Sequence, residues 1–401
     1  MYKITKIAIR NNFLFLFILG NIVLSFFFFL LPSSKTFVYS DITESNGLLF
    51  ASRYSTSELF MTSYRTDFNK SPHNNDHQII ALRDKEIVWQ YDENLAYPHG
   101  LYYTSNQSLL LCDCGNNRII EIAYPSKIIL RIWNLANLNR TLFQLLFNYS
   151  LPNPIPFDYA HLNDLDIKNY STWTGILVSL RNLNVVLELN WTAFEIKEET
   201  QITWFYGNPQ NTSMLNHQHS PKYVNNTIGI ADSKNSRILL LNYSTKEIIW
   251  EYAENLHWVR DFEFISENEI LITDSDQIIV YNKATKQISF QLQENLIAPY
   301  HAKIIGTNIL VANQFAGNIM VFDITGKLVW NYGISTPFYF FLFNSSLSIA
   351  FIIIILVFLK LTKKSAFVFS LILISILLIQ LNFRLISNIF LNCLFLKTNL
   401  V

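Results

Sequence analysis

The chain has 401 residues, of which 50% are hydrophobic and 15% charged, and its 30 Lys and Arg residues balance 30 Asp and Glu residues. No nucleic-acid partner is expected, because phosphate contacts need clustered basic side chains, and the apolar fraction excludes a disordered chain. The 32 Phe residues and a mean hydropathy of +0.21 point instead to membrane segments.

The first element is an apolar run over residues 13–31, long enough as a helix to cross a hydrocarbon core of roughly 30 Å. It follows three basic residues, Lys3, Lys6 and Arg10, so the positive-inside rule places the N-terminus in the cytoplasm. A cleaved signal peptide is the alternative, but its apolar region is usually only about 7–15 residues long. We therefore expect an uncleaved anchor over residues 1–34.

Residues 35–336 repeat one pattern, an apolar strand that ends in aromatic residues. The copies cover residues 86–91, 201–206, 247–252, 287–292 and 327–332. Most of them follow two short β-branched runs joined by Asp, Asn, Gly or Ser, which indicates an antiparallel hairpin. With one more short strand before the hairpin, the unit has four strands in roughly 40–50 residues, which is typical of a β-propeller blade.

Five clear copies and a divergent first one over residues 48–91 predict an all-β fold, a six-bladed β-propeller. A solenoid of stacked sheets is the rival architecture. It would need a polar cap at each end, which the sequence lacks, whereas a closed ring needs none.

Two further apolar runs follow, over residues 338–359 and roughly 366–383, with Lys360, Lys363 and Lys364 between them. This lysine-rich link should be cytoplasmic, which places residues 35–336 outside the cell, in agreement with the N-terminal charges. The short apolar tail, residues 385–396, is expected to lie at the membrane interface. The sequence thus predicts a multi-pass cell-membrane protein with an anchor over 1–34, an extracytoplasmic propeller over 35–336, and two transmembrane helices with a tail over 337–401.

The innermost strands of a propeller converge on its axis. Aligning the blades on their hairpins places one polar residue from each of five innermost strands at the same position: His99, Asn163, His219, Arg260 and His301. The spacing agrees, because residues 219 and 260 are 41 apart, as are residues 260 and 301. His161 and His217 lie two residues earlier on their strands and would share that face. A single histidine at this position could have a structural role, as a hydrogen-bond partner of a neighbouring blade. The convergence of several polar residues on the axis favours a functional site.

Other repeated residues have simpler explanations. Asp113, Asp232 and Asp274 end the same hairpin strand in three blades and are expected to form turns. The outer aromatic residues should pack between blades. Cys112 and Cys114 are one residue apart on a predicted strand, where a disulfide is not expected.

An arginine fork among imidazoles and an asparagine suits an anionic ligand, and a histidine near neutrality can act as a nucleophile or a proton donor. No cluster has the sequence spacing of a metal site, so no metal and no other cofactor is predicted. A three-histidine metal centre is the alternative.

The residues resemble the arylsulfate sulfotransferases, six-bladed propellers that move a sulfuryl group from one phenol to another without a nucleotide donor. The similar motifs are His-Leu-Asn-Asp-Leu-Asp at 161–166, Leu-Val-Ser-Leu-Arg-Asn-Leu-Asn at 177–184 and His-Gln-His at 217–219. Looser similarity covers residues 48–333. The flanking apolar runs look like those of archaeal membrane-anchored members.

The resemblance implies that His219 is transiently sulfated while an aryl sulfate donor gives its sulfuryl group to a phenolic acceptor. It further implies that the sulfate oxygens are held by His99, His161, Asn163 and Arg181. Arg181 comes from the resemblance alone, whereas Arg260, His301 and His217 are expected at the substrate from the repeat register. The alternative is a non-catalytic surface propeller that binds a protein or an anionic glycan.

Overall fold

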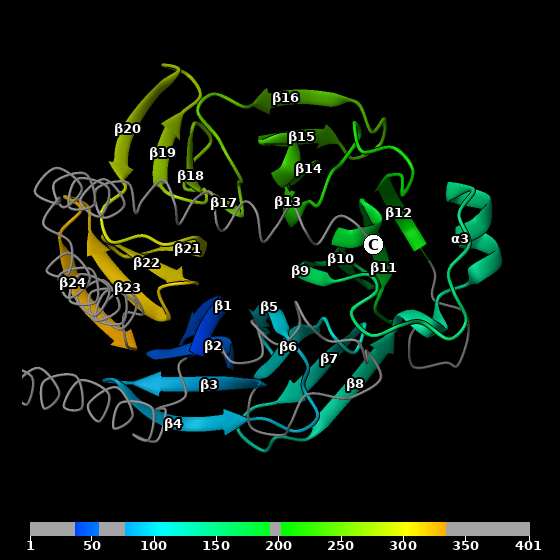
Figure 1. Ribbon diagram of the computed structural model, residues 1–401, viewed down its shortest axis with the longest axis horizontal. Helices are drawn as coiled ribbons and strands as arrows, with labels where there is room; N and C mark the ends of the chain where they lie inside the picture. The colour runs from blue at the N-terminus through cyan, green and yellow to red at the C-terminus, as the bar shows by residue number, and fades with distance from the viewer. Residues whose placement is uncertain (1–36, 56–76, 193–201, 334–401) are drawn as a thin grey trace, which may run out of the picture.

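The computed structural model describes residues 37–55, 77–192 and 202–333. They form six four-stranded antiparallel sheets arranged around a central axis (Figure 1). Each sheet consists of four strands that are consecutive in the chain, so each sheet is one propeller blade. The predicted all-β, six-bladed β-propeller is confirmed.

Blades one to three contain the strands β1 (Phe37–Ser45), β2 (Leu48–Ser55), β3 (His77–Arg83), β4 (Glu86–Tyr91), β5 (Pro98–Tyr103), β6 (Ser108–Asp113), β7 (Arg118–Ala123), β8 (Ile129–Asn134), β9 (Leu162–Asn169), β10 (Thr174–Leu180), β11 (Val185–Asn190) and β12 (Ile202–Gly207). Blades four to six contain β13 (His219–Val224), β14 (Thr227–Asp232), β15 (Arg237–Asn242), β16 (Ile248–Tyr252), β17 (Asp261–Phe264), β18 (Glu269–Thr273), β19 (Ile278–Asn282), β20 (Gln287–Leu292), β21 (Pro299–Ile305), β22 (Asn308–Asn313), β23 (Asn318–Asp323) and β24 (Leu328–Gly333).

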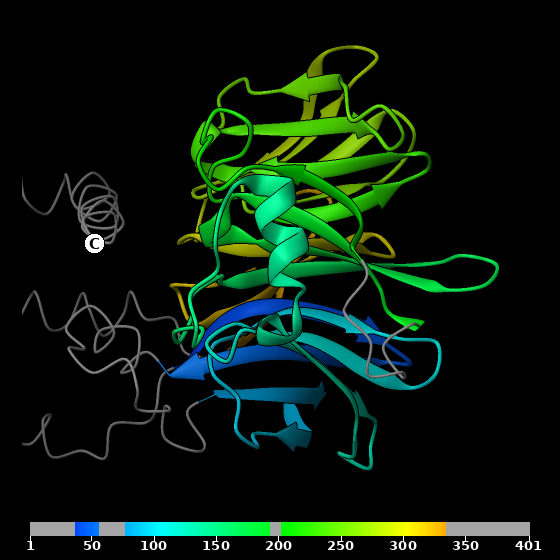
Figure 2. The same cartoon turned by 90° about the vertical axis from the view of Figure 1, so that its right-hand side faces the viewer.

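In the described residues, helical structure is confined to short pieces, with one α-helix, α3 (Arg140–Phe147), on the flank of the ring (Figure 2). Asn139 caps α3 by accepting a hydrogen bond from the backbone N–H of Leu142. Three 3₁₀ turns complete the set: η1 (Leu135–Asn137), η2 (Arg181–Leu183) and η4 (Ser233–Asn235). None of the helices in the described ranges is long and apolar enough to cross a membrane. The predicted spans 13–31, 338–359 and 366–383, and the tail, lie outside those ranges.

The hydrophobic core of the described residues is divided into six clusters, five of them shared by two neighbouring blades. The sixth joins blades two and three with α3 and includes Val38 and Tyr54 of blade one. Phe50 of blade one, for example, packs with Leu109 of blade two. Successive residues of a strand point to opposite faces of the sheet, so each blade packs one face against each neighbouring blade. Burial of a Leu, Ile or Phe side chain stabilises the fold by roughly 1.5–3 kcal/mol. The apolar side chains pack between blades, and polar side chains surround the axis.

The ring closes without exchange of a strand, since β1 and β24 belong to different sheets. Ile80 and Ala51 of blade one instead share a buried cluster with Ile319 of blade six. The outer aromatic residues join blades as predicted. The indole N–H of Trp89 donates to the Pro125 carbonyl of the next blade at 2.9 Å.

Six strands lie innermost and contact one another around the axis: β1, β5, β9, β13, β17 and β21 (Figure 1). We call the end of the ring at which these strands begin the upper face. Antiparallel pairing brings the end of the second strand and the start of the third to the same face, as in the pair Pro98 and Asp113. Two kinds of connection therefore meet there: the loop that precedes each inner strand and the turn between the second and third strands of each blade.

Candidate functional site

A layer of six residues, one from the start of each inner strand, surrounds the axis near the upper face. This upper layer consists of Ser40, His99, Asn163, His219, Arg260 and Tyr300. The equivalence of the positions follows from repeated contacts. The Ser40 hydroxyl donates to the Pro98 carbonyl of the next blade at 2.6 Å, and the Asn163 amide donates likewise to the Gln218 carbonyl at 2.9 Å.

Blade six contributes Tyr300 to this layer, not His301. Pro299 pairs with Asn313 as Pro98 pairs with Asp113, so Tyr300 is equivalent to His99. The Tyr300 ring stacks on His99 at a centroid distance of 5.1 Å. The pairing of the first two strands is irregular in both blades, but it skips Tyr300 in blade six and Gly100 in blade two. The prediction of His301 from equal sequence spacing is therefore wrong by one residue.

His301 belongs to a lower layer with Asp41, Gly100, Asp164, Ser220 and Asp261. Its Nδ1 lies 3.1 Å from an oxygen of Asp41 and 3.2 Å from one of Asp261. Burial disfavours ionisation of Asp261, but Lys222 and His301 together hold its pKa below the usual value. Burial raises the pKa of Asp41 and of Asp164. The lower layer is thus a cluster of buried carboxyl groups around His301, next to Lys222 and beneath the imidazoles.

Only glycine fits at position 100, because the next blade approaches its backbone closely. A Cβ there would lie 2.8 Å from the Asp164 Cα, and its φ of +38° disfavours other residues. His99 therefore sits directly against blade three, where its ring lies 5.3 Å from that of His161.

His219 is held as one tautomer. Its Nδ1 lies 3.0 Å from the His217 carbonyl, which can only accept, and 2.7 Å from the Ser233 hydroxyl. That hydroxyl donates to the Val259 carbonyl at 2.6 Å. The proton of His219 is therefore on Nδ1, and the lone pair on Nε2 accepts a hydrogen bond from Arg260 Nη1 at 3.0 Å.

The electrostatics keep this imidazole neutral. Burial, followed by the positive charges of Arg260 and Arg181, lowers the pKa of His219 well below its usual value. Burial and the neighbouring His161 do the same to the pKa of His99. At neutral pH both rings are uncharged bases.

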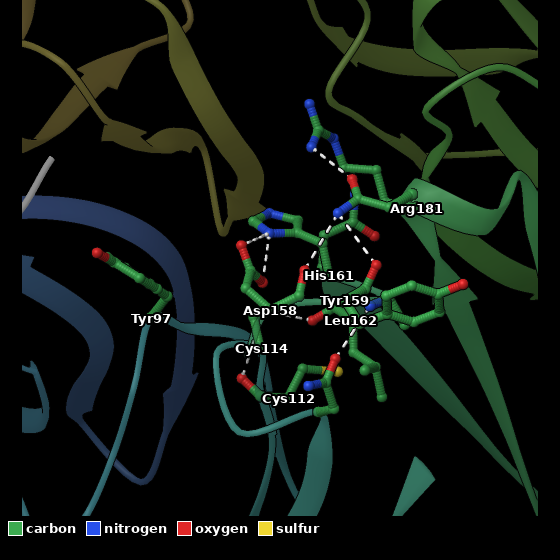
Figure 3. Close-up of polar contacts among 12 residues, drawn as sticks. Tyr97, Cys112, Cys114, Asp158, Tyr159, His161, Leu162 and Arg181 are labelled. Atoms are coloured by element: carbon green, nitrogen blue, oxygen red, sulfur yellow. Dashed lines mark hydrogen bonds and ion pairs between the residues drawn. The ribbon is translucent and has the colours of Figure 1, made fainter. Parts of the chain in front are cut away.

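His161 and His217 lie above this layer and are partly exposed. Both have left-handed backbone, with φ of 48°, as do the equivalent Tyr97 and Ala298. The Nδ1 of His161 lies 2.9 and 3.0 Å from the two oxygens of Asp158, so it donates to that carboxylate and leaves Nε2 available (Figure 3). Burial, with Arg181 next, lowers the pKa of His217 to about 3.

Arg181 begins the turn after β10, in the place that Ser233 takes in blade four (Figure 3). Its Nη1 donates to Asn182 at 3.1 Å, while its Nε is buried without a hydrogen-bond partner among the described residues. Burial lowers its pKa, yet a guanidinium remains charged at neutral pH. The residue that came from the resemblance alone thus faces the same histidines as the others.

Arg260 is buried, and its guanidinium carbon lies 5.3 Å from the centre of the Tyr300 ring and 5.0 Å from that of Trp258. Burial lowers its pKa to about 10, so it is still a cation at neutral pH. The site therefore combines two buried or partly buried guanidinium groups with neutral imidazoles, an arrangement that suits a tetrahedral anion.

The three hairpin aspartates have structural roles, as predicted, but they bind the loop before the inner strand of their blade and not only their own turn. Asp232 accepts from the backbone N–H of Asn216 at 2.7 Å and from Arg237 Nε at 2.8 Å. Asp113 and Asp274 likewise bind the backbone of the loop that precedes their blade's inner strand. These carboxylates therefore fix the loops that carry the site.

Two groups in the described part of the chain have donors close enough to hold a metal ion. One consists of His99, Cys114 and His161, and the other of His257, Asp274 and Asp276. Cys112 and Cys114 are free thiols, as expected from their spacing.

Three site residues were not predicted from the sequence: Tyr300, Asp158 and Cys114. Aligning Pro299 with Pro98 would have found Tyr300. Asp158 lies in an irregular loop with no repeat partner, so no periodic signal marks it. Cys114 follows Asp113 as Arg181 follows Leu180 and Ser233 follows Asp232, a register that becomes evident only from the strand pairing.

Comparison with known proteins gives information on the fold of the chain and none on a reaction. A family model described as NHL repeat matches residues 95–121, which lie in blade two. No curated protein matches the chain. Among solved structures, the chain is similar to one of streptogramin B lyase, with 18% identity and a TM-score of 0.41 over 60% of this chain and 70% of that chain.

It is also similar to the crystal structure of BamB from Moraxella catarrhalis, with 11% identity and a TM-score of 0.37 over 73% and 72% of the two chains. Both TM-scores are below 0.5, so neither similarity bears on function. The chain is a six-bladed β-propeller that contains an NHL repeat, and none of these similarities points to a particular reaction.

Proposed function

We propose that the protein is an aryl sulfotransferase that moves a sulfuryl group from an aryl sulfate to a phenol through a sulfohistidine at His219. The observation that carries the proposal is the tautomer of His219. Its Nδ1–H is bound to the His217 carbonyl, and the lone pair of Nε2 faces a guanidinium. A neutral ring with an unprotonated Nε2 is the form that a nucleophile requires.

In the first step, the Nε2 lone pair forms a bond to sulfur while the bond from sulfur to the aryl oxygen breaks. The phenolate leaves with that electron pair. His219 becomes a sulfated imidazole whose Nδ1–H stays bound to the His217 carbonyl. Charge on the sulfuryl oxygens falls beside Arg260 and Arg181, so these guanidinium groups supply the electrostatic stabilisation, with His99 and Asn163 as further donors.

In the second step, a phenolic oxygen attacks the sulfur, the bond from nitrogen to sulfur breaks, and its electron pair returns to Nε2. The phenolic proton needs an acceptor. His161 is suited to this role because Asp158 binds its Nδ1–H and leaves Nε2 as a base. Its side chain is 18% exposed, so it can pass the proton to water.

The second candidate function, a propeller that binds an anion or an anionic glycan without chemistry, is favoured by one observation. His219 is only 1% exposed, and Arg260 covers its Nε2. For transfer, a sulfuryl oxygen must take the Arg260 hydrogen bond so that sulfur can reach Nε2. A binder needs no such exchange.

The proposed location is the cell membrane, with the upper face toward the bilayer. β1 begins at Phe37 on this face, and β24 ends on it at Gly333, level with Asn318. Residues 32–36 separate Phe37 from the predicted apolar run 13–31, and residues 334–337 separate Gly333 from the next apolar run. At roughly 3.5 Å per residue, such links reach at most about 20 Å. The proposed acceptor is therefore a phenol that partitions into lipid.

The proposal is tested by following phenol release from a chromogenic aryl sulfate in the presence of a phenolic acceptor. The wild-type chain should turn over, and His219→Ala should lose activity to the background level. His257→Ala is the matched control, because that histidine is exposed on the rim of blade five. Wild-type activity in His219→Ala would exclude the sulfohistidine, and absence of turnover with intact anion binding would favour the binder.

A further inference from the structure

One thiol and two imidazoles meet beside the proposed reaction site. The donor atoms of His99, Cys114 and His161 all lie within 4.8 Å of one another. They come from β5, from the turn after β6, and from the loop before β9 in the next blade. From these contacts we infer that the three residues form a site for a soft monovalent metal ion, Cu(I), at the seam of blades two and three.

The distances suit a three-coordinate ion. Bonds of about 2.0–2.3 Å to nitrogen and sulfur place the ligand atoms of a trigonal site roughly 3.5–4 Å apart. Donors that are already within 4.8 Å reach that arrangement by small side-chain rotations. Sulfur with imidazole nitrogen is also the donor set that copper prefers, whereas Mg²⁺ and Ca²⁺ take oxygen ligands.

The surroundings orient the ligands as in an assembled metal site. Asp158 binds Nδ1–H of His161 and directs Nε2 away from itself, the carboxylate contact commonly found behind a metal-bound histidine. Nδ1 of His99 is buried and has no hydrogen-bond partner among the described residues. Figure 3 shows Cys114, His161 and Asp158 in one cluster.

Charge selects Cu(I) over a divalent ion. The Cys114 thiol is buried and donates to the Leu162 carbonyl at 2.6 Å. Exchange of that proton for Cu(I) breaks the S–H bond, forms an S–Cu bond, releases H⁺ to the buffer and leaves the net charge unchanged. A divalent ion would add a positive charge near Arg181, whose backbone N–H donates to the carbonyl of the ligand His161 at 3.3 Å.

A bound ion would occupy His99, which the proposed reaction uses as a donor to the sulfate oxygens, and His161, which it uses as the proton acceptor. Metal binding and sulfuryl transfer therefore exclude each other, and Cu(I) acts as an inhibitor. The metal site does not depend on the proposed function, because its ligands are assigned from geometry and its main test needs no turnover.

The test uses the full chain with Cys393→Ser as background, reduced and free of oxygen, and titrated with the coloured Cu(I) complex of bicinchoninate. Loss of colour should report transfer of one equivalent to the protein. Cys114→Ser should weaken binding at least tenfold. Cys112→Ser is the matched control, because that thiol is equally buried two residues away and lies outside the donor set, and it should bind like the background chain.

His161→Gln, at a partly exposed position, provides a second variant should Cys114→Ser fail to fold, and it should also weaken binding at least tenfold. X-ray absorption at the copper edge should show one sulfur and two nitrogen ligands. Equal Cu(I) affinity in the background chain, Cys114→Ser and His161→Gln, or an equal loss in Cys112→Ser, would overturn the assignment.

Discussion

The chemistry of the site depends on which residue occupies the Nε2 side of His219. In this protein it is Arg260, whose guanidinium donates to the Nε2 lone pair at 3.0 Å. The same group that would stabilise the sulfuryl oxygens also covers the nucleophile. Whether Arg260 assists or blocks can therefore be decided by one substitution.

Arg260→Met removes the charge and keeps much of the apolar stem. If Arg260 stabilises charge in transfer, kcat for a chromogenic aryl sulfate should fall about 10²- to 10³-fold. Steady-state kinetics with donor and acceptor measures this change. An increase in kcat would mean that Arg260 only covers Nε2, which contradicts its proposed role.

His217 gives a pH dependence with a defined sign. Its pKa is about 3 in the folded chain, against about 6.5 when unfolded. Between these values the unfolded state binds the proton and the folded state does not, so stability falls as the pH drops below about 6.5. One such site contributes at most about 1.4 kcal/mol per pH unit.

His217→Gln should therefore lose less stability than the wild type on acidification. Urea unfolding at pH 7, 6 and 5 measures the difference in slope. His257→Gln is the control, because the His257 side chain is 66% exposed. Parallel curves for the wild type and His217→Gln would show that His217 does not stay neutral in the fold.

At the scale of elements, the repeat was predictable and the loop geometry was not. Alternating apolar residues and turn chemistry marked the strands, and convergence of the inner strands placed His99, Asn163, His219 and Arg260 in one layer. The left-handed backbone of His161 and His217 was not predicted, because only a few per cent of residues other than Gly adopt it and no repeated pattern marks these two. Tertiary hydrogen bonds impose it, such as the one from the His217 N–H to Asn184.

Asp232 shows how the hairpins support these loops. Asp232→Ala would remove the acceptor of the Asn216 N–H and leave Arg237 without its buried carboxylate. We expect a loss of about 3 kcal/mol in the free energy of unfolding, together with reduced turnover because residues 216–219 lose their anchor.

Urea denaturation and aryl sulfate turnover of the same samples test this pair of effects. Asp276→Ala, at an exposed carboxylate of blade five, should cost less than about 1 kcal/mol. If Asp232→Ala and Asp276→Ala lost the same free energy of unfolding and the same turnover, Asp232 would have no special role in holding the loop.

At the scale of the whole molecule, the ring places the site and both described chain ends on one face. No residue pattern shows this directly, because it follows from the even number of strands in every blade. A chain that enters at an inner strand and leaves from an outer strand begins and ends on the same face. Apolar runs that flank such a ring would hold the site toward the membrane.

Two positions in blade six test the orientation. Glu294 is exposed before β21 at the upper face, and Thr307 is exposed in the turn at its other end. Fluorophores on Glu294→Cys or Thr307→Cys, each with Cys393→Ser, should respond differently to a lipid-attached quencher in proteoliposomes. Strong quenching only at position 294 is expected, and stronger quenching at position 307 would place the upper face away from the bilayer.

A sulfohistidine at His219 can be detected by intact-mass measurement after brief incubation of the chain with an aryl sulfate in the absence of acceptor. We expect a gain of one sulfuryl group in the wild type, located at His219 by fragmentation, no gain in His219→Ala, and loss of the group when a phenol is added. Turnover without any such gain, or the same gain in His219→Ala, would show that His219 does not carry the sulfuryl group.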